Sequence, residues 1–344
     1  MTVGGFLGAG KTTLLARAAT ALLARGKRVV VVTNDQAPGL VDTQIVALTG
    51  VPTAEVAGAC FCCAFPDFAA KASALIEAHA PDVILAEPVG SCVDIAATVL
   101  RPLARQRPDV HRVAPFTVVV DPAAWRATDG AMDPTTAYIY RKQIAEADVV
   151  LLNKADVEPR EALDACEAGL AACCPAPEVR RVSAATGEGV DAWLDAVLAD
   201  RPGGERRIDV DYDTYAAGEA ALGWLNAEVE LDGDVAWSDT LEAVMRGIGA
   251  RLPVAHLKCL LRSGERVEVS NAVAGRPTPV ARTLRAGAPT SRATVVVNAR
   301  VACTPTELRR VTEATLRDLP GVRGNVVSLR AFAPGRPVPI HRVA

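Results

Sequence analysis

Four short runs of consecutive apolar residues alternate with longer amphipathic segments through the first 200 residues of the chain. Each run has three or four apolar residues and ends in polar or turn-forming residues, which is typical of strands buried on both faces of a parallel sheet. Strands are therefore expected within residues 27–35, 81–90, 114–122 and 147–156, and helices within residues 11–26, 65–80, 136–147 and 161–174. This alternation predicts an α/β fold, a mostly parallel sheet flanked by helices, with ligands at the carboxyl ends of the strands.

The pattern changes after a polar stretch that contains Gly and Pro, RPGGERR, at residues 201–207. Such a stretch is typical of a linker. We predict a first domain over residues 1–200, a linker over 201–208 and a smaller α+β domain over 209–344. The second domain is expected to have two βαβ-like halves, with strands within residues 222–231, 255–273, 292–302 and 325–333 and helices within residues 238–252 and 304–319.

Composition narrows the function classes. The 344-residue chain is 50% hydrophobic and has a formal net charge of −3, so it has no basic excess that would favour nucleic acid or an anionic membrane. It has no apolar run of membrane-spanning length and no secretory signal, so we expect a cytoplasmic protein. Nine cysteines in a reducing compartment are metal ligands or redox groups more often than disulfides.

Residues 5–12, GFLGAGKT, match the phosphate-binding pattern GxxxxGK[ST] directly before a predicted helix. The backbone N–H groups of such a loop cradle phosphate, its lysine reaches the β- and γ-phosphates, and its hydroxyl binds Mg²⁺. The predicted nucleotide contacts here are Gly5, Gly8, Ala9, Gly10, Lys11, Thr12 and Thr13. Only three residues precede Gly4, so either the first strand is very short or the natural start lies upstream, and we favour the second.

The tetrapeptide Asn153-Lys154-Ala155-Asp156 follows the apolar run VVLL. A carboxylate at Asp156 could accept hydrogen bonds from the N1–H and 2-amino groups of guanine, a donor pair that adenine lacks. Ser183 and Ala184, at the end of the next expected strand, could offer a backbone N–H to the guanine oxygen. We therefore predict GTP as the nucleotide.

Two loops are expected to sense the γ-phosphate. Glu87 ends one predicted strand and could hold Mg²⁺ through water, and Gly90 is small enough for its N–H to approach the terminal phosphate. Asp35 and Asp42, after the second strand, could orient the magnesium ion or the attacking water. The catalytic set predicted from the sequence is Lys11, Thr12, Asp35, Asp42 and Glu87, with Thr12 and Glu87 on magnesium.

Three cysteines, Cys60, Cys62 and Cys63, occupy four consecutive positions of the same region. Thiolates bind Zn²⁺ and Co²⁺ strongly, and three of them leave a coordination position open, which suits transfer of the ion. The alternatives are small buried core residues or a redox sensor. Cys166, Cys259 and Cys303 are expected in the core. For Cys92, close to Gly90, a functional role and a structural role both stay open.

The order of GGFLGAGKTTLL, CxCC, a strand ending in Glu and Gly, and NKAD resembles the CobW-like GTPases, relatives of HypB and UreG. The resemblance implies a P-loop GTPase that delivers a metal, usually zinc or cobalt, with the CxCC as metal site. The sequence departs from the usual GCxCC, because Ala59 precedes Cys60, and it has no His-rich tract. These departures leave the metal and the client open.

The predicted function is a GTP-hydrolysing metallochaperone with slow intrinsic turnover, which binds GTP, Mg²⁺ and Zn²⁺ or Co²⁺. Its expected partner is a client metalloprotein or cofactor-assembly protein that binds the carboxyl-terminal domain, and a homodimer is left open. Two alternatives remain. One is a GTP-dependent reactivator of a cofactor-bearing enzyme, for example a corrinoid enzyme, and the other is a regulatory GTPase switch without metal delivery.

Overall fold

The computed structural model describes residues 1–106, 112–175, 177–199, 201–274 and 281–343. The chain forms two compact units. The first comprises Met1–Gln36, Asp42–Gly218 and Arg336–Ala344, and the second comprises Ala37–Val41 and Glu219–Gly335. The chain divides after Gly218, beyond the linker predicted at 201–208. The segment Ala37–Val41 belongs to the second unit although it lies within the sequence of the first, and Arg336–Ala344 belongs to the first unit although it follows the sequence of the second.

The first unit contains a parallel sheet, as predicted. Strands β1 (Val3–Gly5), β5 (Thr117–Val120), β6 (Val149–Leu152) and β7 (Glu178–Arg181) form one part, and β3 (Thr53–Ala57), β2 (Val29–Asp35) and β4 (Val83–Glu87) form the other. A parallel bridge between Thr2 and Ala86 joins the parts into the order β3-β2-β4-β1-β5-β6-β7. The chain order reverses on either side of β1, and the phosphate-binding loop follows that strand, as ligand sites do in open α/β sheets.

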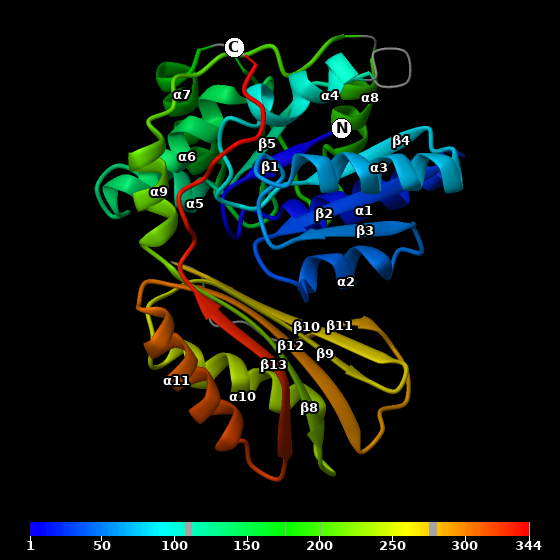
Figure 1. Ribbon diagram of the computed structural model, residues 1–344, viewed down its shortest axis with the longest axis vertical. Coiled ribbons are helices and arrows are strands. Elements are labelled where there is room, and N and C mark those ends of the chain that lie inside the picture. Colours follow the sequence, from blue (N-terminus) through cyan, green and yellow to red (C-terminus); the bar gives the residue numbers. More distant parts are fainter. Residues whose placement is uncertain (107–111, 176, 200, 275–280, 344) are drawn as a thin grey trace. The chain divides into compact units, whose positions relative to one another are not determined.

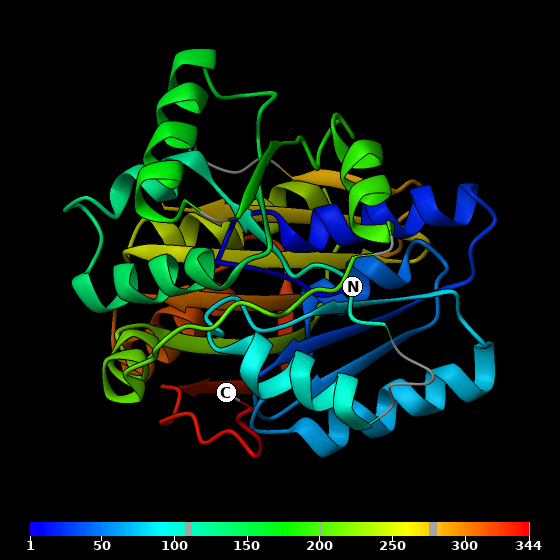
Figure 2. The ribbon, with the colours of Figure 1, turned by 90° about the horizontal axis from the view of Figure 1, so that it is seen from above.

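Helices cover both faces of this sheet. Leu14, Leu15 and Leu22 of α1 share a buried core with Trp193 of α8, and in Figure 2 the strands of this region lie between α1 and α8 on one side and α3 and α4 on the other. The helices are α1 (Lys11–Ala24), α2 (Val41–Ala47), α3 (Phe65–His79), the π-helical turn η1 (Ala96–Leu100), α4 (Arg101–Gln106), α5 (Pro122–Ala127), α6 (Pro134–Glu146), α7 (Arg160–Cys173), α8 (Val190–Leu198) and α9 (Tyr212–Ala220).

The second unit is a six-stranded antiparallel sheet in the order β11-β10-β9-β12-β8-β13, with two helices on one face (Figure 1). Its elements are β8 (Gly223–Asp232), α10 (Trp237–Gly249), β9 (Val254–Ser263), β10 (Arg266–Val273), β11 (Arg282–Arg285), β12 (Arg292–Val301), α11 (Pro305–Arg317) and β13 (Arg323–Phe332). The expected βαβ-like halves interleave: β12 lies between β8 and β9, and β8 lies between β12 and β13, so that all neighbouring strands are antiparallel.

In the part of the chain that the structure describes, every helix is too short or too polar to cross a lipid bilayer.

Candidate functional site

The phosphate-binding loop has the backbone that its glycines permit. Gly5, Gly8 and Gly10 have φ values of 133°, 75° and 101°, which residues with a Cβ rarely adopt. The loop ends at Lys11, the first residue of α1, whose ammonium group donates to the Phe6 carbonyl at 3.4 Å. Strand, turn and helix therefore meet here as a phosphate cradle requires.

Three of the predicted catalytic residues converge at the start of α1. The Thr12 hydroxyl donates to Glu87 Oε1 at 3.0 Å and also contacts the Asp42 carboxylate. Hydroxyl and carboxylate oxygens are the donors that Mg²⁺ prefers, so this set fits a magnesium ion. Asp35 is 2% exposed, and its Oδ1 accepts from the N–H of Gln36, the next residue, at 2.7 Å.

Gly90 lies against the phosphate-binding loop. A Cβ on Gly90 would come within 2.8 Å of Leu7 Cδ2 and 3.1 Å of the Lys11 Nζ, so this position has no room for a side chain. Gln143 of α6, which the sequence analysis missed, donates its amide N–H groups to the carbonyls of Gly90 at 3.0 Å and Cys92 at 2.9 Å. A single buried amide therefore fixes the loop after β4.

Asn153 connects the two halves of the predicted nucleotide pocket. Its Nδ2 donates to the Ala9 carbonyl at 2.7 Å, and its Oδ1 accepts from the Ala184 N–H at 2.9 Å. The side chain thus binds the phosphate loop and the segment after β7, and the Ala184 N–H that was expected to meet guanine has Asn153 as its partner here. Ser183 is buried, and its Oγ accepts from the Thr186 N–H at 3.0 Å.

The residues of the tetrapeptide after Asn153 are more exposed to solvent. Lys154 has a left-handed backbone with φ of 64°, and its ammonium group pairs at 2.5 Å with Asp121, the residue that caps α5. Asp121 was not singled out from the sequence, although it directly follows the apolar run of its strand, as Asn153 does in the next strand. Asp156 is exposed, where a carboxylate can receive a ligand.

The three clustered cysteines come together in the turn before α3. Cys60 and Cys62 are buried and Cys63 is half-buried, and their sulfur atoms all lie within 4.8 Å of one another. The Cys60 and Cys62 sulfurs are 2.9 Å apart and those of Cys62 and Cys63 are 3.7 Å apart. A tetrahedral zinc with Zn–S bonds of about 2.3 Å separates its sulfurs by about 3.8 Å, so the cluster fits such an ion after small movements.

Asn34, near the carboxyl end of β2, holds the cysteine turn. Its Nδ2 donates to the carbonyls of Val56 at 2.9 Å and Ala59 at 2.8 Å, and its Oδ1 accepts from the Phe61 N–H at 2.8 Å. The carbonyl of Asp35 accepts from the Gly58 N–H at 3.1 Å. The strand that leads toward Asp42 therefore also supports the metal ligands.

The thiols differ in acidity because they hydrogen-bond to one another. The Cys62 thiol, followed by those of Cys63 and Cys92, stabilises the thiolate of Cys60 and lowers its pKa. The hydrogen bond to Cys60 raises the pKa of Cys62 and raises that of Cys63 to about 11. Cys60 is therefore the sulfur that ionises first, and the others lose their protons to an arriving cation.

The carboxyl-terminal segment Arg336–Val343, which the sequence analysis did not connect with the site, crosses the cysteine turn. The Val338 N–H donates to the Cys63 sulfur at 3.3 Å, and the Ile340 N–H donates to the Cys62 carbonyl at 3.1 Å. The His341 ring lies edge-on to Phe65 at 5.0 Å between centroids. Its sequence, RPVPIHRV, has two prolines and no periodic pattern from which this position could have been predicted.

Of the remaining cysteines, Cys166 and Cys259 are fully buried in the core, as expected. Cys303 is half-buried beside the core of the second unit. Cys92 is 4% exposed, and its thiol is one of the groups that lower the pKa of Cys60.

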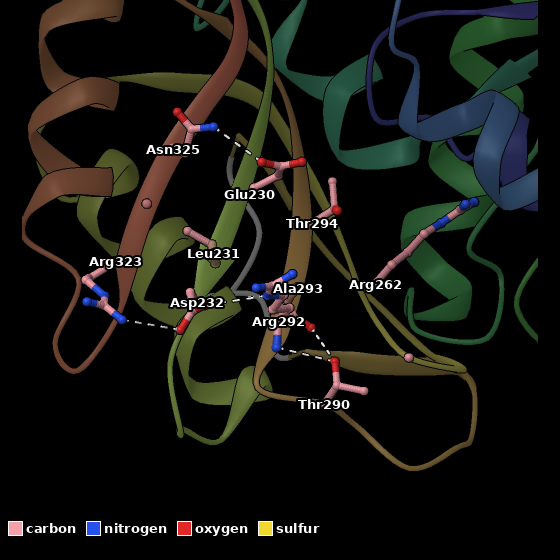
Figure 3. A pocket seen from close by; sticks show the side chains of 12 residues that line it. Glu230, Leu231, Asp232, Arg262, Thr290, Arg292, Ala293, Thr294, Arg323 and Asn325 are labelled. Atoms are coloured by element: carbon pink, nitrogen blue, oxygen red, sulfur yellow. Dashed lines mark hydrogen bonds and ion pairs between the residues drawn. The ribbon is translucent and has the colours of Figure 1, made fainter.

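A separate pocket of about 710 Å³ lies on the sheet of the second unit. Figure 3 shows that Arg292 and Arg323 both point to Asp232, at 3.6 and 3.8 Å, and that Asn325 contacts Glu230. The remaining lining includes Arg262, Gly264, Thr290 and Thr294. The pocket is thus polar and of mixed charge, and it contains none of the predicted nucleotide or metal residues.

Comparison with known proteins gives relatives at modest identity. The chain is 32% identical over 220 residues to the hydrogenase maturation factor HypB of Azotobacter vinelandii, covering 62% of this chain and 65% of that protein. It is 30% identical over 219 residues to the zinc chaperone CobW of Pseudomonas aeruginosa, covering 54% and 56% respectively. The chain thus spans less than two thirds of the length of these curated relatives.

Among solved structures, the zinc-bound YjiA GTPase from E. coli is 15% identical and matches 91% of this chain and 97% of its own, with a TM-score of 0.35. The family model described as "CobW/HypB/UreG, nucleotide-binding domain" matches residues 1–180. That range contains the phosphate loop, the cysteine turn and the NKAD tetrapeptide, and the chain belongs to the CobW/HypB/UreG family.

Proposed function

We propose that this chain is a GTP-hydrolysing metallochaperone that holds Zn²⁺ or Co²⁺ on Cys60, Cys62 and Cys63 and passes it to a client protein. The observation that carries the proposal is the position of Asn34. It binds the cysteine turn through three hydrogen bonds and lies eight residues before Asp42, whose carboxylate meets Thr12 at the phosphate loop. One strand end thus connects the nucleotide site with the metal site.

The nucleotide chemistry follows from the residues around Thr12. Thr12, Glu87 and Asp42 would hold Mg²⁺, which neutralises charge on the phosphates when bound. Lys11 would contact the β- and γ-phosphates, and Gly90, against the lysine, would approach the terminal phosphate. Asp156 would select guanine. We also propose that the chain by itself hydrolyses GTP slowly.

The second unit takes part through the segment Ala37–Val41. Asn298 Oδ1 accepts from the Val41 N–H at 2.8 Å, and its Nδ2 donates to the Gly39 carbonyl at 3.1 Å. Asn226 Nδ2 donates to the Ala37 carbonyl at 3.2 Å. Asp42, whose carboxylate contacts Thr12, directly follows Val41, which this sheet holds. We propose that the client binds the second unit.

Delivery requires that the metal bind the GTP and GDP states with different affinity. The name of one relative, a zinc chaperone, supports a metal cargo. Three thiolates leave one position of a tetrahedral ion for a client ligand.

The test is anaerobic zinc and cobalt titration of the whole chain with GDP and with a non-hydrolysable GTP analogue. We expect one tightly bound ion, a different affinity in the two states, and loss of the ion in Cys62→Ser with GTP binding retained. Unchanged metal occupancy in Cys62→Ser would remove the thiol site. Absence of tight binding in both states would instead favour a cofactor-enzyme reactivator or a switch without delivery.

A further inference from the structure

The carboxyl-terminal strap, residues 336–343, is tied to the first unit at both of its ends. Arg342 Nε pairs with the Asp94 carboxylate at 2.7 Å, and Asp94 is 1% exposed. At the other end, Arg336 Nε pairs with Asp213 at 2.7 Å. A buried carboxylate is costly without a cation, so the pair with Asp94 holds the strap in place. The residues between the two arginines cross the cysteine turn.

The middle of the strap contacts the cysteine turn through its backbone. The Val338 N–H donates to the Cys63 sulfur at 3.3 Å, and the Ile340 N–H donates to the Cys62 carbonyl at 3.1 Å. The other two residues of 337–340 are prolines, which have no N–H, so both donors of this stretch are directed to the turn. The Val338 and Ile340 side chains are 68% and 51% exposed. Burial of apolar side chains therefore does not explain this contact, whereas the two hydrogen bonds do.

The sulfur that accepts from Val338 is a better acceptor when it is charged. A neutral thiol is a weak hydrogen-bond acceptor, whereas a bond to an ionised acceptor is roughly twice as strong as a neutral one. Cys63 is also the half-buried member of the cluster, while Cys60 and Cys62 are buried. The N–H therefore suits the thiolate form of Cys63, which is the form that binds a metal ion.

We propose that the Val338 backbone N–H is a positioning group of the metal site, which donates to the sulfur of Cys63 when that sulfur binds the ion. It acts through Cys63 and does not touch the ion. Groups that hydrogen-bond to metal ligands orient them, and their removal weakens metal binding by about 10- to 100-fold. The proposal rests on the proposed function and adds that the end of the chain is part of the site, although Val338 lies 275 residues after Cys63.

The experiment removes this one N–H from the whole chain, purified without oxygen. Val338→Pro lacks the N–H, and Val338→Ala keeps it but shortens the exposed side chain. A second removal installs the α-hydroxy acid analogue of valine at position 338 by nonsense suppression, which replaces the N–H by an oxygen and keeps the side chain. Deletion of the strap is avoided, because it would leave Asp94 without its cation.

Zinc affinity is measured by competition with a chromophoric chelator, and the metal–sulfur bonds are followed by Co²⁺ absorption. Circular dichroism and GTP binding check that each variant is folded.

We expect the zinc affinities of the wild type and Val338→Ala to agree within about threefold, and both N–H-free proteins to bind zinc about 10- to 100-fold more weakly. Their sulfur-to-cobalt band keeps its intensity, because the same thiolates remain. It moves to longer wavelength, because a sulfur without the hydrogen bond gives up electrons more easily.

Wild-type zinc affinity and band position in both folded N–H-free proteins, with binding lost in Cys62→Ser, would overturn this inference and leave the proposed function standing. Weaker binding with an unmoved band, or an equal loss in Val338→Ala, would show that the strap acts only by packing and would also overturn it. A wild type without tight binding would overturn both.

Discussion

Two buried asparagines allow the nucleotide site and the metal site to be perturbed separately. Asn34 is 6% exposed and makes three hydrogen bonds to the backbone around the cysteine turn, and Asn153 is 2% exposed and makes two around the nucleotide pocket. A typical hydrogen bond contributes about 1 kcal/mol net. Asn34→Ala should therefore cost about 3 kcal/mol of unfolding free energy, and Asn153→Ala about 2 kcal/mol.

The effect on ligand binding follows from which loop each side chain orders. Since 1.4 kcal/mol is a factor of ten, loss of the Asn34 contacts should weaken zinc binding by about 10- to 100-fold. GTP binding by metal-free Asn34→Ala should change less than about threefold, whereas Asn153→Ala should show the opposite selectivity. Each ligand is titrated in the absence of the other, so that coupling between the sites does not enter.

The assays are calorimetric GTP titration, chelator competition for zinc and urea unfolding of the same preparations. Each variant is the control for the other, because both remove a buried asparagine from the same unit. The reasoning is refuted if both variants weaken both ligands equally, or if Asn34→Ala binds zinc as the wild type does.

Two further predictions concern the first unit. Gly10→Ala should abolish GTP binding in a folded protein, measured by calorimetry and circular dichroism, because its Cβ would lie 2.3 Å from Asn153 Nδ2 at φ of 101°; retained binding would contradict this. Burial raises the pKa of Glu146 from 4.5 to about 8. Its folded form keeps a proton that the unfolded form loses, so stability should fall between pH 4.5 and 8, by at most about 1.4 kcal/mol per pH unit, and Glu146→Gln should flatten that slope in urea unfolding. An unchanged slope would show that other groups dominate.

The sequence was most informative where a functional motif directly follows a strand. The apolar runs predicted the parallel strands, and the spacing of glycines, Lys11 and Thr12 predicted a loop that the structure shows at the start of α1. Strand β3 was not predicted, because its five residues are mostly half-buried at the sheet edge and contain no long apolar run.

Supporting contacts could not be predicted in the same way. The contacts of Gln143, of Asn34 and of residues 336–343 join residues that are far apart in the sequence and meet only in the folded chain. The contact between Val338 and Cys63, for example, joins residues that are 275 positions apart. A lone glutamine in a helix has no distinguishing pattern. The interleaved strands of the second unit were missed for a similar reason, because local periodicity does not tell which strands become neighbours.

The contact between Val338 and Cys63 also has a consequence for synthesis of the chain. Ribosomes extend a chain at roughly 5–20 residues per second, so the cysteines emerge roughly 14 to 55 s before the residues that cover them. During that interval the thiols of the nascent protein are accessible to oxidants and to whatever ions the surrounding fluid contains. The segment 336–343 can settle over the turn only after it has itself been made, so the earliest opportunity for loading or for damage precedes this contact.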